Sequence, residues 1–231
     1  MNLKGILAIA FGAFSALSSL LALLYLAGFI QNRYSFSTID SGLQIPVSEA
    51  MLVNLGLLGL FGLQHSGMAR RSVKRLMPEL LERSAYLVAT AIVLAVLFYR
   101  WEPMPQPVWF TPIRWPFLIL VALGAVLVVW SVLWQGALHF FAYHQVLAYA
   151  RGRTYTPPPF RATGLYRYTR HPMMIGSMLY IWPANDMTQG HLLFAVVMTA
   201  YVLMAVRWEE RDLVRTHGES YREYSATVRR F

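Results

Sequence analysis

The sequence predicts an all-α fold: a polytopic integral membrane helical bundle with about five to six membrane segments, including a short C-terminal helical hairpin. Three observations support this prediction. Of the 231 residues, 57% are hydrophobic and only 13% are charged, whereas about 25% of an ordinary soluble domain is charged. Long runs without a charged residue recur along the chain, and the basic residues gather in alternate connecting segments.

The first half of the chain contains three uncharged runs, each followed by polar residues. Residues 5–32, 50–68 and 84–99 contain no Lys, Arg, Asp or Glu. About 20 apolar residues are enough to cross a bilayer as a helix. These runs therefore predict three spans. The first 26 residues lack a small-residue cleavage site, so the first run is interpreted as a retained helix rather than a signal peptide.

The fourth uncharged run, residues 115–150, is the longest, with 36 residues. As one helix it would be about 54 Å long, well beyond a hydrocarbon core of about 30 Å. It is predicted to extend into the cytoplasm and to carry His139 and His144 there. Two short apolar pieces, 172–183 and 191–206, are separated by the turn sequence PANDMTQG. They predict a hairpin in which neither piece spans comfortably alone.

The basic residues set the orientation. Of the 20 Lys and Arg residues, only Arg33, Arg100 and Arg114 fall on one side of the predicted bundle. Positive residues favour cytoplasmic segments, so both termini are expected in the cytoplasm. The net charge of +9 is then explained by this bias, and no nucleic-acid partner is expected. Membrane lipids are expected partners, and the sequence does not predict an oligomeric state.

No metal site is predicted. The chain has no cysteine, which excludes thiolate ligands and disulfides. His65, His139 and His144 are the histidines to consider. His139 and His144 are five residues apart rather than the four of a helical two-histidine site, and no acidic ligand lies nearby in sequence.

Residues 164–176, GLYRYTRHPMMIG, place polar and basic residues directly before an apolar run. Proline is favoured in the first turn of a helix, so Pro172 predicts a helix start with His171 at the N-cap. Free backbone amides beside Arg170 would then form a receptor for a carboxylate or phosphate. The alternative interpretation is that Arg167 and Arg170 are only charged anchors at the membrane surface.

The acidic pair Glu209 and Glu210, in the sequence RWEERD, follows the last apolar piece. Adjacent helical residues point about 100° apart, so these two carboxylates cannot face the same way. One is expected to turn inward and the other towards solvent. The alternative is a solvated pair that interacts with Arg207 or Arg211.

Together, these motifs resemble the membrane methyltransferases related to isoprenylcysteine carboxyl methyltransferase. The resemblance rests on GLYRYTRHPMMIG, then EERDL, then HGESYREYSATV, in that order. The segments LFGLQHSGMARRSVK and NDMTQGHLLF further resemble the methanethiol S-methyltransferase subgroup, which borders on the NnrU-like proteins. The resemblance implies that S-adenosyl-L-methionine is the cofactor, that a small hydrophobic thiol, methanethiol, is the methyl acceptor, and that dimethyl sulfide is the product.

The family motif also implies site residues. Those implied to bind the cofactor are Tyr166, Arg170, His171, Gly176, Glu209, Glu210, Tyr221 and Tyr224. The chain departs from the pattern twice, with Met174 in place of a tyrosine and Arg229 in place of a proline. The whole chain, 1–231, is expected to form one membrane methyltransferase domain. In it, 1–150 would supply four membrane helices, and 151–231 the cytoplasmic loop, hairpin and tail of the cofactor site.

The methyl acceptor would need a base or cation near its sulfur, because a thiolate is the better nucleophile. His65 is the first candidate base, since imidazole works near neutral pH; Arg70 and His144 follow. The active site is expected to face the cytoplasm, at a bacterial inner (cell) membrane. Three alternatives stay open: a larger lipid or isoprenylcysteine acceptor, a membrane reductase of the steroid-reductase type, and a non-enzymatic NnrU-like protein.

Overall fold

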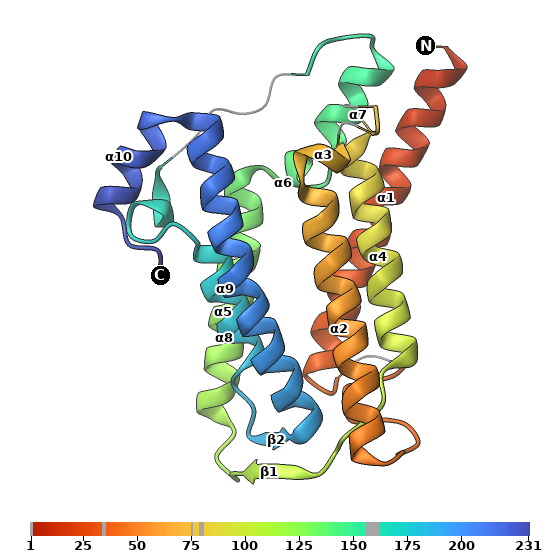
Figure 1. The fold of residues 1–231 in the computed structure, drawn as a ribbon, viewed down its shortest axis with the longest axis vertical. Helices are drawn as coiled ribbons and strands as arrows, with labels where there is room; N and C mark the ends of the chain where they lie inside the picture. Colours follow the sequence, from red (N-terminus) through yellow and green to blue (C-terminus); the bar gives the residue numbers. More distant parts are fainter. Residues whose placement is uncertain (1, 34–35, 75, 79–80, 156–161) are drawn as a thin grey trace. The chain divides into compact units, whose positions relative to one another are not determined.

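The computed structural model describes residues 2–33, 36–74, 76–78, 81–155 and 162–231, and the predicted helical membrane fold is confirmed. Five helices in these ranges are long and apolar enough to cross a membrane (Figure 1). They are α1 (Leu3–Ile30), α2 (Val47–Ala69), α4 (Glu82–Arg100), α5 (Trp115–Gln135) and α9 (Gln189–His217).

The remaining elements are short. The helices are α3 (Arg71–Lys74), α6 (Ala137–Phe140), α7 (Tyr143–Ala150), the 3₁₀ helix η1 (Gly164–Arg167), α8 (Pro172–Ile181) and α10 (Glu219–Thr227). Strands β1 (Pro107–Phe110) and β2 (Asp186–Thr188) pair in a two-stranded sheet.

The chain folds into two compact units, each assembled from segments far apart in the sequence. The first comprises residues 1–109, 135–156 and 187–194, and the second comprises 110–134, 157–186 and 195–231. Every candidate residue below belongs to one of these units.

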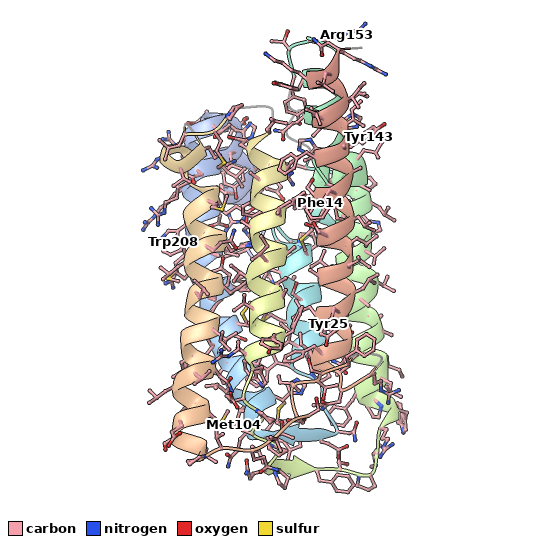
Figure 2. All side chains as sticks on the ribbon, turned by 90° about the vertical axis from the view of Figure 1, so that its right-hand side faces the viewer. Phe14, Tyr25, Met104, Tyr143, Arg153 and Trp208 are labelled. Atoms are coloured by element: carbon pink, nitrogen blue, oxygen red, sulfur yellow. The ribbon has the colours of Figure 1, made fainter. Side chains whose placement is uncertain are left out.

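In the first unit, α1 packs against α4 and α7, and α2 packs against α4. The hydroxyl of Ser19 donates a hydrogen bond to the Leu87 carbonyl, 3.3 Å away, which links α1 to α4. Many apolar side chains of α1 face outward: Phe14 is 58% exposed and projects from the helix (Figure 2). Outward apolar side chains suit a lipid environment, where they meet hydrocarbon rather than water.

The core of the first unit is aromatic where α1 and α4 end. The ring of Trp101 lies 5.8 Å from Phe29 and 6.1 Å from Phe194. Its indole N–H donates to the Ile39 carbonyl at 2.9 Å. The fully buried Asn54 exchanges two hydrogen bonds with the backbone of Glu102, at 2.7 and 3.0 Å. The buried polar groups of Trp101 and Asn54 are thus paired, as the low-dielectric interior favours.

In the second unit, α5 and α8 cross at two glycines. A Cβ added to Gly124 would lie 2.6 Å from the Tyr180 backbone nitrogen and 2.7 Å from the Gly176 carbonyl oxygen. A Cβ on Gly176 would lie 2.8 Å from the Cβ of Leu127. Such distances leave no room for a side chain, so the glycines allow the two backbones to touch. Trp182 then connects α8 to α9, donating to the Thr199 hydroxyl at 2.8 Å.

The prediction of one continuous helix over residues 115–150 is wrong. α5 ends at Gln135, and Gly136 follows with φ +90°, a conformation that breaks a helix and that glycine adopts without strain. A second break occurs at Ala142, with φ +65°. His139 and His144 therefore lie on the separate helices α6 and α7.

The last span also differs from the prediction. α9 has 29 residues and is long enough to cross a bilayer, instead of forming a short piece that needs a partner. Of the two pieces of the predicted hairpin, only α8, with 10 residues, is short. The predicted turn PANDMTQG contains β2, and α9 begins at Gln189 within it. The hydropathy pattern underestimates the length of α9, because the last three turns of this helix contain charged residues.

Candidate functional site

The start of α8 is built as its sequence predicts. His171 is the N-cap residue of α8, and Pro172 occupies the first turn. The preceding residues form η1, and all eight residues implied to bind a cofactor lie in the second unit. They come from η1, the start of α8, the end of α9 and α10. The structure thus gathers segments that are up to 58 residues apart.

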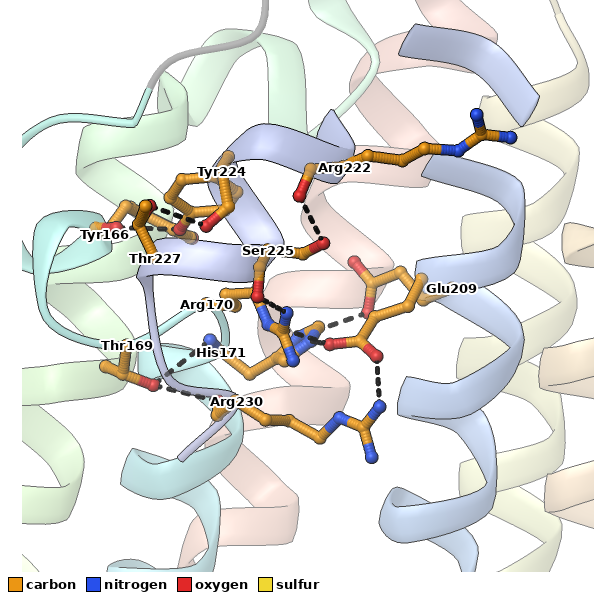
Figure 3. Close-up of polar contacts among 11 residues, drawn as sticks. Tyr166, Thr169, Arg170, His171, Glu209, Arg222, Tyr224, Ser225, Thr227 and Arg230 are labelled. Atoms are coloured by element: carbon orange, nitrogen blue, oxygen red, sulfur yellow. Dashed lines mark hydrogen bonds and ion pairs between the residues drawn. The ribbon is translucent and has the colours of Figure 1, made fainter. Parts of the chain in front are cut away.

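Glu210 is the centre of a polar network that includes Arg170, His171 and Arg230. Figure 3 shows these three partners together with Glu209. The side chain of Glu210 is 12% exposed, against 51% for Glu209, so the two carboxylates do point differently, as predicted. Oε1 of Glu210 lies 3.0 Å from Nε of Arg170 and 3.1 Å from Nε2 of His171. Its Oε2 accepts a hydrogen bond of 2.5 Å from Arg230. Oε2 of Glu209 lies 3.7 Å from the other ring nitrogen of His171.

Arg170 is held on several sides at once. Besides Glu210, its guanidinium donates to the Ser225 carbonyl of α10 at 2.8 Å. Its backbone N–H donates to the Arg229 carbonyl at 2.9 Å. Arg170 therefore bridges α9, α10 and the residues after α10, rather than lying as an unoccupied anion receptor.

Residues 229–231 form a clasp over the segment before α8. Thr169 and Arg229 make a parallel β-bridge, and the Thr169 hydroxyl donates to the Arg230 carbonyl at 3.0 Å. The ring of Phe231 lies 6.1 Å from that of His171. Sequence analysis missed Arg230, because a second arginine after α10 looks like one more cytoplasmic charge.

The two tyrosines of α10 face inward. Tyr221 is 2% exposed and Tyr224 9%, and the Tyr224 hydroxyl donates to the Tyr166 carbonyl at 2.7 Å. Burial raises the pKa of each phenol to about 12. The negative charge of Glu210 raises the pKa of Tyr221 further, and Arg170 opposes it. Both phenols are therefore neutral hydrogen-bonding groups at physiological pH.

A cavity of about 620 Å³ opens beside this network. One face of α9 lines it, with Arg207, Glu210, Arg211 and Arg215, and Tyr221 contributes from α10. Arg170 and Arg230 complete the polar wall, so five guanidinium groups surround one carboxylate. Such a wall attracts anionic groups.

Gly176 has a packing explanation of its own. It meets α5 at Gly124, so close helix contact accounts for the missing side chain. Its predicted part in binding a cofactor stays a prediction.

The three catalytic candidates lie in the first unit. The Tyr86 hydroxyl of α4 lies 2.6 Å from Nε2 of His65 on α2. Arg70 caps the end of α2, donating its backbone N–H to Gly67 at 3.1 Å. His144 is exposed on α7, with its ring 6.5 Å from that of Tyr143. Their catalytic roles stay predictions.

His139, outside the candidate spans, contacts the Tyr155 hydroxyl at 2.5 Å. Burial, followed by the charges of Arg83 and His144, lowers the pKa of His139. Burial raises the pKa of Tyr155. Across the part of the chain that the structure describes, no three His, Cys, Asp or Glu side chains gather in a way that could hold a metal ion.

Comparison with known proteins finds a family match and several similar sequences. Residues 104–228 match a protein family of unknown function, DUF1295. The methanethiol S-methyltransferase of Crocosphaera subtropica is 38% identical over 94% of this chain and 88% of its own length. That of Mycobacterium tuberculosis is 38% identical over 98% of this chain and 96% of its own length. Nurim from Bos taurus is 27% identical over 75% of this chain and 70% of its own length. No solved structure matches the chain.

The five apolar spans and the similarity to known methyltransferases identify an integral membrane enzyme of the methyltransferase class. Within that class, the chain belongs to the DUF1295 family and to the family of methanethiol S-methyltransferases.

Proposed function

We propose that the protein transfers a methyl group from S-adenosyl-L-methionine to methanethiol and so forms dimethyl sulfide. One observation carries the proposal: relatives named methanethiol S-methyltransferase align over nearly the whole chain at 38% identity. Because the alignment includes both the apolar spans and the polar network, the similarity is not confined to a cofactor module. The alternative acceptors and the reductase reading have no comparable support.

The cavity suits the proposed donor. When bound, S-adenosyl-L-methionine supplies an electrophilic methyl group on a sulfonium, and its amino-acid end carries a carboxylate. The guanidinium wall suits that carboxylate, and the half-exposed Glu209 can accept hydrogen bonds from ribose hydroxyls. The volume of about 620 Å³ falls in the range of roughly 300–1,000 Å³ typical of small-molecule sites.

The acceptor would need to lose its proton. We assign that proton to His65, because an imidazole ring can accept a proton and this ring already has a partner in the Tyr86 hydroxyl. A bound donor would supply its methyl group to this thiolate and leave as S-adenosylhomocysteine, and holding the two reactants in position would supply much of the rate enhancement. A His65→Ala variant that keeps full turnover and the same pH profile would remove His65 from this role.

The proposed location is a bacterial cell membrane, with the donor site on the cytoplasmic side. Supporting this, the polar network follows the apolar part of α9 and lies among the basic segments that favour the cytoplasm. We further propose that residues 151–231 supply the donor site of a single methyltransferase domain. A lipid-soluble thiol could then arrive from the bilayer while the charged donor enters from water.

The test is headspace gas chromatography of dimethyl sulfide from purified protein, with methanethiol and S-adenosyl-L-methionine deuterated in the transferred methyl group. Deuterated product from the wild type is expected. Glu210→Gln should lower turnover at least tenfold, because Arg170, His171 and Arg230 lose their shared anion. Glu219→Gln is the matched control: this carboxylate is exposed on α10 and pairs only with Arg222 among described residues, so turnover should persist.

The possible outcomes distinguish the proposed reaction from the alternative acceptor and from a different cofactor. Absence of labelled dimethyl sulfide together with measurable donor binding would exclude methanethiol and favour a larger lipid acceptor. Absence of both product and donor binding would contradict the proposed cofactor.

A further inference from the structure

Two arginines of the cavity, Arg207 and Arg211, have no hydrogen-bond or ion-pair partner in the described ranges. The other three are engaged. Arg170 and Arg230 share Glu210, and Arg215 lies 3.4 Å from Asp212 on its own helix. The cavity therefore contains two positive charges that the protein itself does not neutralise.

The helix places these two charges together. Residues four apart lie on the same face of an α-helix, so Arg207 and Arg211 project side by side from α9 into one cavity wall with Glu210. A planar guanidinium donates two parallel hydrogen bonds to a carboxylate. Two neighbouring guanidinium groups are thus a receptor for a compact anion. The positive-inside rule explains the sign of these residues, but it does not require that both line a cavity.

We infer that Arg207 and Arg211 receive the carboxylate of the donor's amino-acid end and so select a ligand that carries it. This inference rests on the proposed function and deepens it. The sequence predicts a receptor for a carboxylate or phosphate at Arg170, but the guanidinium of Arg170 is occupied by Glu210 and the Ser225 carbonyl. Turning Arg170 towards a ligand would remove one of the partners of the largely buried Glu210 carboxylate, which is costly. Arg207 and Arg211 can bind without breaking any contact of this network.

The test compares two ligands that differ in one group. S-adenosylhomocysteine carries the carboxylate, and its decarboxylated analogue, S-(5′-adenosyl)-3-thiopropylamine, keeps the amine and the nucleoside. Calorimetric titration of the purified full chain measures the affinity for each. In the Arg207→Gln/Arg211→Gln double variant, the affinity for S-adenosylhomocysteine should fall roughly 10- to 100-fold, as expected for lost charge-assisted hydrogen bonds. The affinity for the analogue should stay within about twofold, which also reports that the site is folded.

Arg222→Gln is the matched control, because Arg222 is an exposed α10 arginine paired with Glu219 and does not line the cavity. It should leave both affinities unchanged. An equal loss for both ligands in the double variant would overturn the inference, since the arginines would then support the cavity generally. Unchanged S-adenosylhomocysteine affinity would overturn it as well. If the wild type binds neither ligand, the proposed donor fails first and the carboxylate assignment fails with it.

Discussion

Glu210 is held by two arginines and a histidine, which explains how an ionised carboxylate can be placed at the end of an apolar helix. Its two oxygens meet Arg170, His171 and Arg230. Removing one partner of a buried ion pair is destabilising, because a charge is left without compensation. Arg170, His171 and Arg230 therefore act as a unit, and single substitutions among them should not have additive effects.

Arg230 is the one of these three partners that lies outside the family motif, so its substitution tests whether they act as a unit. Replacing Arg230 by Met should lower donor affinity about tenfold, because Glu210 loses its hydrogen bond of 2.5 Å and can rotate away from His171. Arg230→Lys should recover part of that loss, since it keeps the charge but not the planar geometry. Titration calorimetry with S-adenosylhomocysteine measures both. Equal affinities in wild type and Arg230→Met would show that Glu210 does not depend on the clasp.

The α10 tyrosines provide a pH prediction. Their pKa values are raised to about 12 from an ordinary value of about 10, so folding favours the neutral phenols. The stability that they contribute is complete below about pH 10 and is lost as the pH rises through about 12. Tyrosinate absorbance at 295 nm, measured as the difference between the wild type and Tyr221→Phe, should therefore titrate near pH 12. A midpoint near 10 would show that Tyr221 is solvated.

At the scale of elements, the crossing of α5 and α8 depends on two glycines. Gly124→Ala should lower the free energy of unfolding by about 1–3 kcal/mol, as overpacking does, because its Cβ would meet backbone atoms of α8 at 2.6–2.8 Å. Gly59→Ala on α2 is the control, with no atom within 4 Å of the added Cβ. Thermal unfolding in detergent should show a lower midpoint only for Gly124→Ala. Equal midpoints would mean that the crossing relaxes freely.

Hydropathy predicts the positions of some helices but not where others break or end. The positions of α1, α2 and α4 could be predicted because uncharged runs of span length are bounded by charges. The break at Gly136 could not, since residues 115–150 remain uncharged through it and an apolar run does not reveal where the backbone turns. The charged end of α9 was missed for the opposite reason: its residues leave the apolar core, yet the helix continues.

The site shows a similar division. The resemblance to the family motif pointed to Arg170, His171 and Glu210. The angle of about 100° between adjacent helical residues predicted that only one glutamate turns inward. Arg230 was missed because its contact requires α10 to fold back on residues 166–170. Long-range pairing of this kind leaves no periodic signal in the sequence. Arg207 and Arg211 were read as orientation charges, since the positive-inside rule cannot tell a cavity wall from a surface.

For the whole molecule, the asymmetry of basic residues predicts topology. Because the sequence contains no cysteine, a single introduced cysteine can be labelled specifically with a membrane-impermeant maleimide. Leu43→Cys, 91% exposed between α1 and α2, should react in intact cells. Ala226→Cys, exposed on α10, should react only after lysis, because the positive-inside bias places this helix in the cytoplasm. The reverse labelling pattern would invert the proposed topology.

The clasp formed by residues 229–231 also bears on biosynthesis. All five candidate spans end by His217, and none of them contains Arg230. A chain truncated before residue 229 would therefore keep every span, whereas Glu210 would lack its contact with Arg230 and the segment before α8 would lack its β-bridge. Such a truncated protein would contain everything needed for membrane insertion and yet have an unfinished site.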